Sequence, residues 1–340
     1  MKTLAKKDLT TVLKDWSGQY TLICPNKKSH DESMFDVFDE KTFTLDYTKP
    51  SMPPKSTYLP HSDTIFTVEN GEYHPVINES QGICHLPRVR HMTGILQSRS
   101  FMTADTDDVF YHSRDARTIT VVMACAGPQN ETCFCTSAQS GPFAKKGYDL
   151  QFYDMGDSFL VDIGSEKGSR LAETEGFSDV DEERARGDIQ LFQGNAHQKI
   201  PPLPQLKQAI DKLSNGGVPD DLWERFGKKC IVCGGCTFVC PTCTCFNVFD
   251  RKTGDGSGER IKATDACLYA GFTKEASGHN PRPTQGLRLK RRHEHKLLYY
   301  NDRDTHDSLC TCVGCGRCSD YCPVHIGTIE IVKAIAGEQS

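Results

Sequence analysis

The chain contains two copies of the cysteine motif C-x2-C-x2-C-x3-C-P, and no other feature restricts its fold as strongly. The first copy spans residues 230–241 and the second spans residues 312–323. Three thiolates at this spacing wrap a loop around one [4Fe–4S] cluster, and in two-cluster ferredoxins the fourth cysteine ligates the other cluster. The two motifs therefore predict a C-terminal domain that holds two [4Fe–4S] clusters.

The exchange of the fourth ligand divides the eight motif cysteines into two sets. The first predicted set is Cys230, Cys233, Cys236 and Cys322, and the second is Cys312, Cys315, Cys318 and Cys240. Zinc is the alternative metal, but zinc modules use paired C-x2-C knuckles with four ligands per ion. Two quartets that each end in Cys-Pro fit a zinc module poorly.

A second group of cysteines lies in the N-terminal half. Cys125, Cys133 and Cys135 follow a predicted strand with the spacing C-x7-C-x-C. With Cys84 they supply the four thiolates that one cluster needs, so we predict a third cluster there. Buried thiols without a ligand role are the alternative. Cys24 has no partner in the sequence and is interpreted as structural.

Three more thiols follow the first motif, at Cys243, Cys245 and Cys267. Together with Cys310 they offer ligands for a fourth cluster. A C-x-C pair is also compatible with a supporting or redox role, and spare buried thiols are the alternative.

Seventeen cysteines would also suit a secreted, disulfide-bonded protein. Residues 1–9 are charged and lack the apolar segment of a signal peptide. We therefore expect a cytoplasmic chain whose clustered cysteines bind metal. No run of eighteen apolar residues exists, so no membrane span is predicted. The net charge of −5 gives no reason to expect nucleic acid as a partner.

The fold class expected is α+β. Residues 1–200 are predicted to form a mixed α/β domain, residues 201–229 a helical linker, and residues 230–340 a ferredoxin-like dicluster domain, mostly α-helical, with a polar insertion over 251–309. The prolines of 201–204 mark the first boundary.

Within these domains the apolar patterns predict individual elements. We expect a helix over 1–20 and strands over 20–23, 118–124 and 159–163. Residues 43–125 are expected to alternate short β-type runs with turns, and interleaved helices are plausible there. A helix with Asp220 as N-cap is expected to bury Leu222, Trp223 and Phe226 on one face.

No nucleotide-binding fingerprint and no hydrolase motif is present. Clusters without a hydride or substrate site indicate an electron relay that needs partners at both ends. The basic stretch over 288–292 is interpreted as a solvated helix face, with a docking patch for an acidic partner as the alternative.

The run from Cys230 to Asp250 resembles the iron–sulfur electron-transfer subunit of anaerobic sulfite reductase and the beta subunits of soluble sulfhydrogenases. Further positions match this family in order: Cys84, Cys125, Cys133-Phe134-Cys135, Cys267, Gly271-Phe272, Gly278-His279, Arg288 and His295-Lys296. Cys310 departs from the pattern, so its ligand role is the weakest.

The resemblance implies an anaerobic electron-transfer subunit with several [4Fe–4S] clusters. It implies as partners a flavin subunit that oxidises NAD(P)H and a catalytic subunit, which carries sirohaem or nickel and iron. The main hypothesis is therefore a relay subunit without catalysis of its own. The second hypothesis is an enzyme whose substrate binds a cluster held by only three thiolates, at Cys243, Cys245 and Cys267. The terminal electron acceptor stays open.

Overall fold

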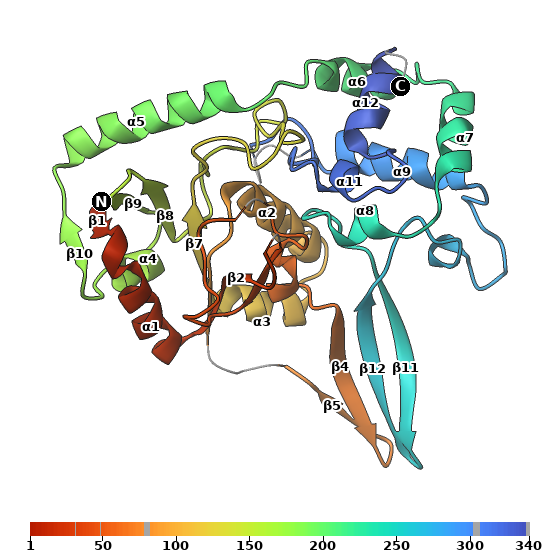
Figure 1. Ribbon diagram of the computed structural model, residues 1–340. Helices are drawn as coiled ribbons and strands as arrows, with labels where there is room; N and C mark the ends of the chain where they lie inside the picture. The colour runs from red at the N-terminus through yellow and green to blue at the C-terminus, as the bar shows by residue number, and fades with distance from the viewer. Residues whose placement is uncertain (31, 48, 78–81, 302–306, 338–340) are drawn as a thin grey trace.

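The computed structural model describes residues 1–30, 32–47, 49–77, 82–301 and 307–337. A mixed eight-stranded sheet forms the first half, a four-stranded sheet projects from the body, and short helices gather at the C-terminal end (Figure 1). The architecture is mixed α and β, as the sequence predicts.

The eight-stranded sheet has the strand order β10-β1-β9-β8-β7-β6-β2-β3. Its strands are β1 (Lys2–Ala5), β2 (Thr21–Lys27), β3 (Ser33–Val37), β6 (Ile83–His85), β7 (Thr118–Met123), β8 (Leu150–Asp154), β9 (Ser158–Ile163) and β10 (Phe177–Asp179). Strands β2, β6, β7 and β8 run parallel to one another, and the remaining pairs are antiparallel. Every residue of β7 is buried, as expected for a β-branched run inside a parallel arrangement.

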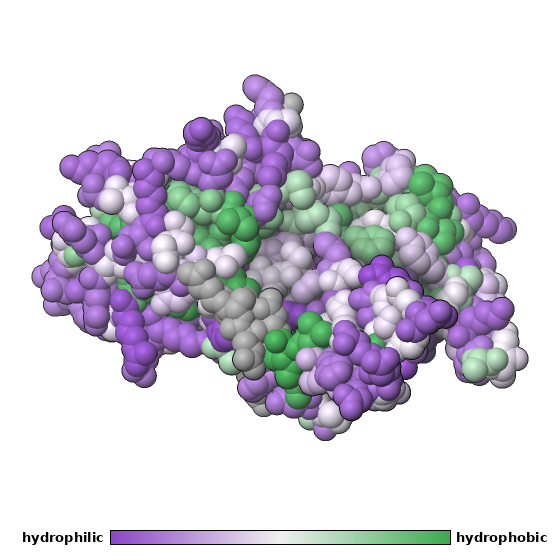
Figure 2. All heavy atoms as spheres, turned by 90° about the horizontal axis from the view of Figure 1, so that it is seen from below, coloured by the Kyte–Doolittle hydropathy of each residue, from purple (hydrophilic) through white to green (hydrophobic). Residues whose placement is uncertain are grey.

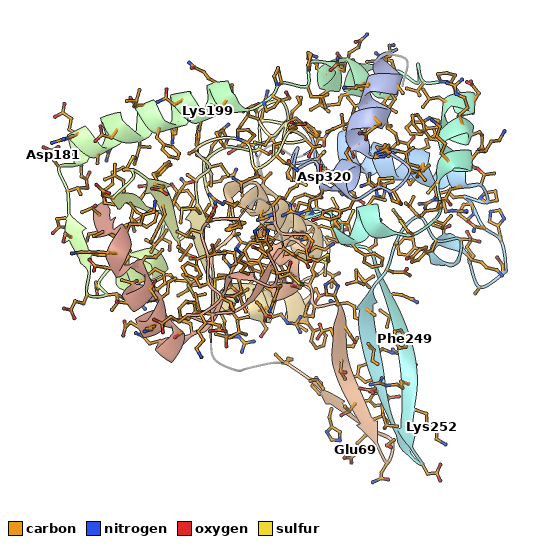
Figure 3. The ribbon with its side chains drawn as sticks, in the orientation of Figure 1. Glu69, Asp181, Lys199, Phe249, Lys252 and Asp320 are labelled. Carbon is orange, nitrogen blue, oxygen red and sulfur yellow. The ribbon has the colours of Figure 1, made fainter. Side chains whose placement is uncertain are left out.

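Five helices pack with this sheet. They are α1 (Leu9–Gln19), α2 (Val89–Thr103), α3 (Val109–Arg117), α4 (Glu166–Leu171) and α5 (Glu182–Lys199). Two apolar cores result, one around Trp16 and Phe152 and another around Tyr58 and Tyr111. The long helix α5, marked at its ends by Asp181 and Lys199, leads the chain from the sheet to the C-terminal helices (Figure 3).

One expectation for the first half needs correction. The predicted helix over 1–20 begins only at Leu9, because Lys2–Ala5 form β1 between β9 and β10 and η1 (Lys6–Asp8) follows. The segment 43–125 contains the helices α2 and α3 as well as the predicted β-type runs. The predicted strands over 118–124 and 159–163 are confirmed as β7 and β9.

The projecting sheet joins two hairpins that lie far apart in the sequence. Its order is β11 (Phe246–Gly254), β12 (Ser257–Thr264), β4 (Ser62–Glu69) and β5 (Glu72–Pro75), and all its strands are antiparallel. Phe249, Lys252 and Glu69 lie along this arm, well away from Asp320 (Figure 3). We call these four strands the β-arm.

The C-terminal helices are α6 (Gln205–Ser214), α7 (Asp220–Lys229), α8 (Gly235–Phe238), α9 (Gln285–Leu297), α11 (Arg317–Asp320) and α12 (Thr328–Ala336), with short turns η2 (Pro54–Thr57) and η3 (Gly271–Thr273) elsewhere. Helix α7 buries Leu222, Trp223 and Phe226 as predicted, although its N-cap is Pro219 and not Asp220. The segment 251–309, expected as a polar insertion, contains most of β11, all of β12 and α9. The C-terminal part therefore combines helices with two long strands.

Candidate iron–sulfur site

The two cysteine motifs adopt the same local structure. In each motif a glycine in the left-handed region caps a four-residue helix, with Gly234 (φ +72°, ψ −8°) before α8 and Gly316 (φ +70°, ψ −8°) before α11. These two helices pack against one another. Burial raises the pKa of Cys236 on α8, and the nearby charges of Arg292 and of Cys318 on α11 act on the same thiol. The sequence repeat is thus also a repeat in space.

The loop of the second motif packs directly on the loop that carries Cys133 and Cys135. The Phe134 amide donates a hydrogen bond to the Gly314 carbonyl at 2.9 Å, and the Ser140 hydroxyl donates one to the Val313 carbonyl at 2.8 Å. A methyl group on Gly314 would come within 2.7 Å of the Cys135 nitrogen. The approach is so close that this position requires glycine.

Four buried cations contact the backbone of the cysteine loops: Lys49, Lys55, Arg292 and Lys296. Lys49 Nζ donates to the Cys315 carbonyl at 2.8 Å, and Lys55 Nζ donates to the Cys243 carbonyl at 3.0 Å. Arg292 Nη2 donates to the Cys236 carbonyl at 2.9 Å, and Lys296 Nζ donates to the Thr242 carbonyl at 2.9 Å. We call this set the cation shell.

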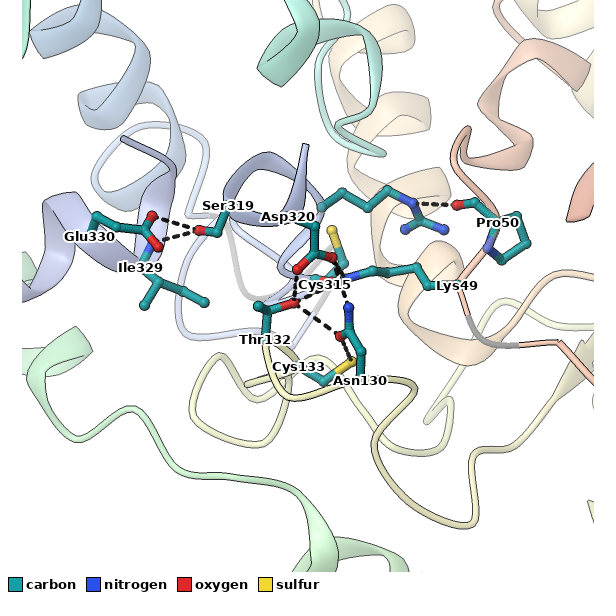
Figure 4. Close-up of polar contacts among 11 residues, drawn as sticks. Lys49, Pro50, Asn130, Thr132, Cys133, Cys315, Ser319, Asp320, Ile329 and Glu330 are labelled. Carbon is teal, nitrogen blue, oxygen red and sulfur yellow. Dashed lines mark hydrogen bonds and ion pairs between the residues drawn. The ribbon is translucent and has the colours of Figure 1, made fainter. Parts of the chain in front are cut away.

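Lys49 is the centre of the best-connected part of this shell (Figure 4). Its ammonium group pairs with Asp320 and donates to Thr132 Oγ1 at 3.1 Å. Thr132 in turn donates to Asp320 at 2.7 Å. Arg317 of the same motif donates from Nε to the Pro50 carbonyl at 2.9 Å, beside Lys49 in the sequence. The N-terminal half thereby contacts the second motif through hydrogen bonds and an ion pair that involve both side chains and backbone.

The charge state of the shell follows from burial and from the thiols around it. Burial lowers the pKa of Lys55, and the thiols of Cys243 and Cys240 offset only part of this effect. Burial also lowers the pKa of Lys296, but here Cys240 and Cys243 outweigh it and the pKa lies above its usual value. Buried amines are expensive unless anions neutralise them. The shell therefore favours anionic sulfur at this place.

Cys243, Cys245 and Cys267 line one small pocket of about 40 Å³, together with Arg292, Lys296 and residues from α2. The Cys245 thiol donates a hydrogen bond to Cys267, which lowers the pKa of Cys267 to about 6 although burial opposes the shift. Cys243 likewise hydrogen-bonds to Cys240. The three thiols predicted to bind a fourth cluster are thus brought together, next to the fourth cysteine of the first motif.

The N-terminal cysteines separate into two places. Cys125, Cys133 and Cys135 are buried on the connection between β7 and β8. Cys84 lies on β6 in the apolar core with Cys24, and it pairs in register with Ile119. The other three cysteines follow the end of β7, which lies at Met123. Met123 is four residues beyond Ile119, the partner of Cys84, so the end of β7 lies about 13 Å along the strand from Cys84 at the usual rise per residue. The structure therefore brings Cys84 beside Cys24 and not beside the other three.

The basic stretch over 288–292 was expected to be a solvated face, and this expectation is wrong for its inward side. Arg288, Arg292 and Lys296 follow one another at four-residue steps, so they share one face of α9, and Arg292 is only 2% exposed. His293 is also buried, and burial followed by the Arg292 charge lowers its pKa to about 3. For Arg292 and Lys296, the four-residue spacing was the sequence signal that could have predicted a shared face of the helix. Lys49 and Lys55 carry no such signal.

The residues present fit iron–sulfur clusters. All seventeen cysteines are free thiols, and eight of them lie on two loops with the same backbone turn and with cations at their carbonyls. Among the described residues, no three His, Cys, Asp or Glu side chains converge closely enough to hold a single metal ion. The case for clusters therefore rests on the repeated motif and its surroundings.

Comparison with known proteins bears on this site directly. Residues 229–326 match the family model described as a 4Fe-4S dicluster domain. The chain contains a 4Fe–4S dicluster domain. This supports at least two [4Fe–4S] clusters, and a third or fourth stays a prediction.

The chain is also similar to sulfhydrogenase 2 subunit beta of Pyrococcus furiosus, with 29% identity over 294 residues, or 86% of this chain and 85% of the relative. The resemblance to the beta-subunit family of iron–sulfur proteins is thereby confirmed, and it extends well beyond the dicluster domain. No solved structure matches the chain. None of the described helices is long and apolar enough to cross a membrane.

The close approach at Gly314 generates a first prediction. Gly314→Ala places a methyl group against the Cys133–Cys135 loop and forces alanine to φ +58°. We expect a loss of about 2 kcal/mol in stability and a lower iron content after anaerobic reconstitution. The control is Gly271→Ala, where the added methyl group meets no atom within 4 Å. Equal iron content and equal denaturation midpoints in both variants would contradict the prediction.

The separation of Cys84 from the other N-terminal cysteines generates a second prediction. Cys133→Ala is expected to remove about four irons per chain, the content of one cluster. Cys84→Ala is expected to leave the iron and acid-labile sulfide unchanged, because that thiol faces an apolar core. Both variants remove one buried thiol, so each controls for the other. If Cys84→Ala also removed about four irons, Cys84 would be a ligand after all.

Proposed function

We propose that this chain is the iron–sulfur electron-transfer subunit of an oxidoreductase complex. In this proposal it relays electrons between a catalytic subunit of the hydrogenase or sulfite reductase type and a flavin-containing, NAD(P)H-binding subunit. Its own part is non-catalytic, and the complex is cytoplasmic and anaerobic. The similarity to a sulfhydrogenase beta subunit supports partner subunits in general.

The observation that carries the proposal is the continuity of the cysteine loops. The charge of Cys318 of the second motif acts on the pKa of Cys236 of the first. Cys315 and Cys133 both act on the pKa of Lys49, so the second motif and the N-terminal loop meet at that ammonium group. When bound, [4Fe–4S] clusters supply one-electron redox chemistry. These contacts support a relay in which the predicted ligand loops are neighbours of one another.

We assign the ligands as the motif spacing predicts. One cluster takes Cys230, Cys233, Cys236 and Cys322, and the other takes Cys312, Cys315, Cys318 and Cys240. A third cluster at the loop of Cys125, Cys133 and Cys135, and a fourth at the pocket of Cys243, Cys245 and Cys267, complete the proposal. The proposed domains are residues 1–200, 201–229 and 230–340, the last being ferredoxin-like around its motif helices.

The cation shell gives these thiolates their electrostatic role. Each cluster with four thiolates carries net negative charge, and the net charge is one of the factors that set its reduction potential. Arg292 and Lys296 approach thiols of both motifs or of the pocket, and the thiols keep the pKa values of both cations high. We infer that the shell raises the reduction potentials, because a fixed positive charge stabilises the added electron.

Lys296→Met tests this role. The variant keeps most of the side-chain volume and removes the charge beside Cys240 and Cys243. We expect at least one midpoint potential to fall on the order of 60 mV, a tenfold change in a one-electron equilibrium constant. Lys290→Met on the outer side of α9 is the matched control and should shift no potential. Redox titration followed by electron paramagnetic resonance measures both, and identical potentials in the three proteins would refute the role of the shell.

The function itself is tested on the purified, anaerobically reconstituted chain. We expect at least about eight irons with matching acid-labile sulfide, and about twelve or more if the further clusters form. We also expect reversible reduction by dithionite without hydrogen oxidation or sulfite reduction. Catalysis of either reaction by the chain alone, or zinc in place of iron, would overturn the proposal.

The pocket of Cys243, Cys245 and Cys267 favours one alternative, an enzyme with its own substrate site. Three thiolates would leave one iron of a cluster open to a small ligand. Cyanide or a small thiol would then perturb the spectrum of one cluster only. An unchanged spectrum would dismiss this alternative.

A further inference from the structure

Cys233 differs from every other cysteine in its surroundings. All seventeen cysteines lie within the described residues, and Cys233 is the one that is exposed. Its loop is fixed from behind, because the Tyr269 hydroxyl donates a hydrogen bond to the Cys233 carbonyl at 3.2 Å and Gly234 packs against that same hydroxyl. A predicted cluster ligand therefore lies at the surface, on a loop that a hydrogen bond ties to Tyr269.

Two exposed apolar side chains directly precede this ligand in the chain, where water would favour polar ones. Ile231 is 58% exposed and Val232 is 37% exposed. Val232 has φ +59°, a conformation that is costly for a β-branched residue. Gly314, the equivalent residue of the second motif, has φ +58°, so the turn of the motif imposes this conformation on Val232. On the face of the molecule drawn in Figure 2, most of the surface is hydrophilic and the apolar residues form separate areas.

The charge next to this tip has one sign. Helix α7 ends in Lys228 and Lys229, which are both exposed and directly precede Cys230. Arg225 of the same helix pairs with Asp221, and Glu224 is the nearest acid before the two lysines in the sequence, so the positive charge at this end comes from Lys228 and Lys229. The whole chain is acidic, with a net charge of −5, so this local excess stands against the overall balance. An acidic partner would be attracted to this end of α7.

We propose that Ile231, Val232 and Cys233, together with Lys228 and Lys229, form the surface where an acidic redox protein docks. We call this surface the electron port. The proposal rests on the proposed function and adds the location and the partner chemistry. The apolar tip excludes water, and the lysines select negative charge. One electron passes between the partner's redox group and the one held by Cys233; no bond or proton moves, and the donor is oxidised by that one electron.

The test uses the reconstituted full chain and an acidic two-[4Fe–4S] ferredoxin as the probe. Lys228→Glu/Lys229→Glu reverses the charge of the port, and Lys7→Glu/Lys41→Glu makes the same change at exposed positions near the large sheet. Binding of the oxidised ferredoxin is measured by calorimetry, which needs no turnover. The rate of reduction by the reduced ferredoxin is measured by stopped flow. Iron and sulfide content is recorded for each protein.

At low ionic strength we expect the port variant to bind the ferredoxin with an affinity lower by about tenfold or more, and to be reduced by it at a rate lower by a similar factor. The difference should shrink as salt is added, because screening removes it. The control pair should match the unaltered chain. If the double charge reversal does not fold, the variant Lys228→Gln/Lys229→Gln takes its place. We expect it to show an intermediate loss of affinity and rate.

Equal binding and equal rates in the port and control variants, with normal iron content, would overturn the port and leave the relay function intact. An unaltered chain that takes up no iron would overturn the proposed function instead. A loss that is as large in the control pair would show a general charge effect and would also reject the port.

Discussion

Buried positive charge on the backbone of the cysteine loops is the interaction on which the rest of this structure depends. An ammonium group without a counter-charge would be unstable in such a place. Each cation of the shell nevertheless donates to a carbonyl of a cysteine segment, and Lys296 and Arg292 have raised pKa values because thiols surround them. The cysteine loops and the buried cations therefore stabilise one another. Neither half of this arrangement would be stable if the sulfur atoms were replaced by neutral, apolar groups.

The shell also explains why the first two hundred residues are needed by a dicluster domain. Lys49 and Lys55 come from the connection between β3 and β4, and the Cys133–Cys135 loop follows β7. Through them the large sheet fixes the position of both motifs. Electron transfer between fixed centres requires fixed separations, and a sheet with a buried parallel centre is a rigid support for them.

Much of this could be predicted from the sequence, and the misses have physical causes. The two motifs, β7, β9 and the buried face of α7 follow from short-range patterns that local chemistry enforces. Residues 2–5 were missed as a strand because four residues between two partner strands gain their structure from tertiary pairing. Cys84 matched a family pattern, yet its side chain belongs to an apolar core, and only three-dimensional register reveals this. Lys49 and Lys55 look like surface lysines in sequence, since nothing local marks a lysine whose hydrogen-bond partner lies nearly two hundred residues or more away.

The β-arm has a consequence for the way this chain can be made and divided. Strand β12 pairs on one side with β11 and on the other with β4, which is separated from it by just over half the chain. A fragment starting at residue 201 would leave the long edge of β12 bare, and an unpaired edge of that kind invites self-association. A ribosome also releases β4 long before β12 exists, so the first hairpin waits in solvent until the cysteine motif has emerged. The β-arm can therefore be completed only after both halves of the chain have been synthesised. Strand pairings with such a large sequence separation form slowly.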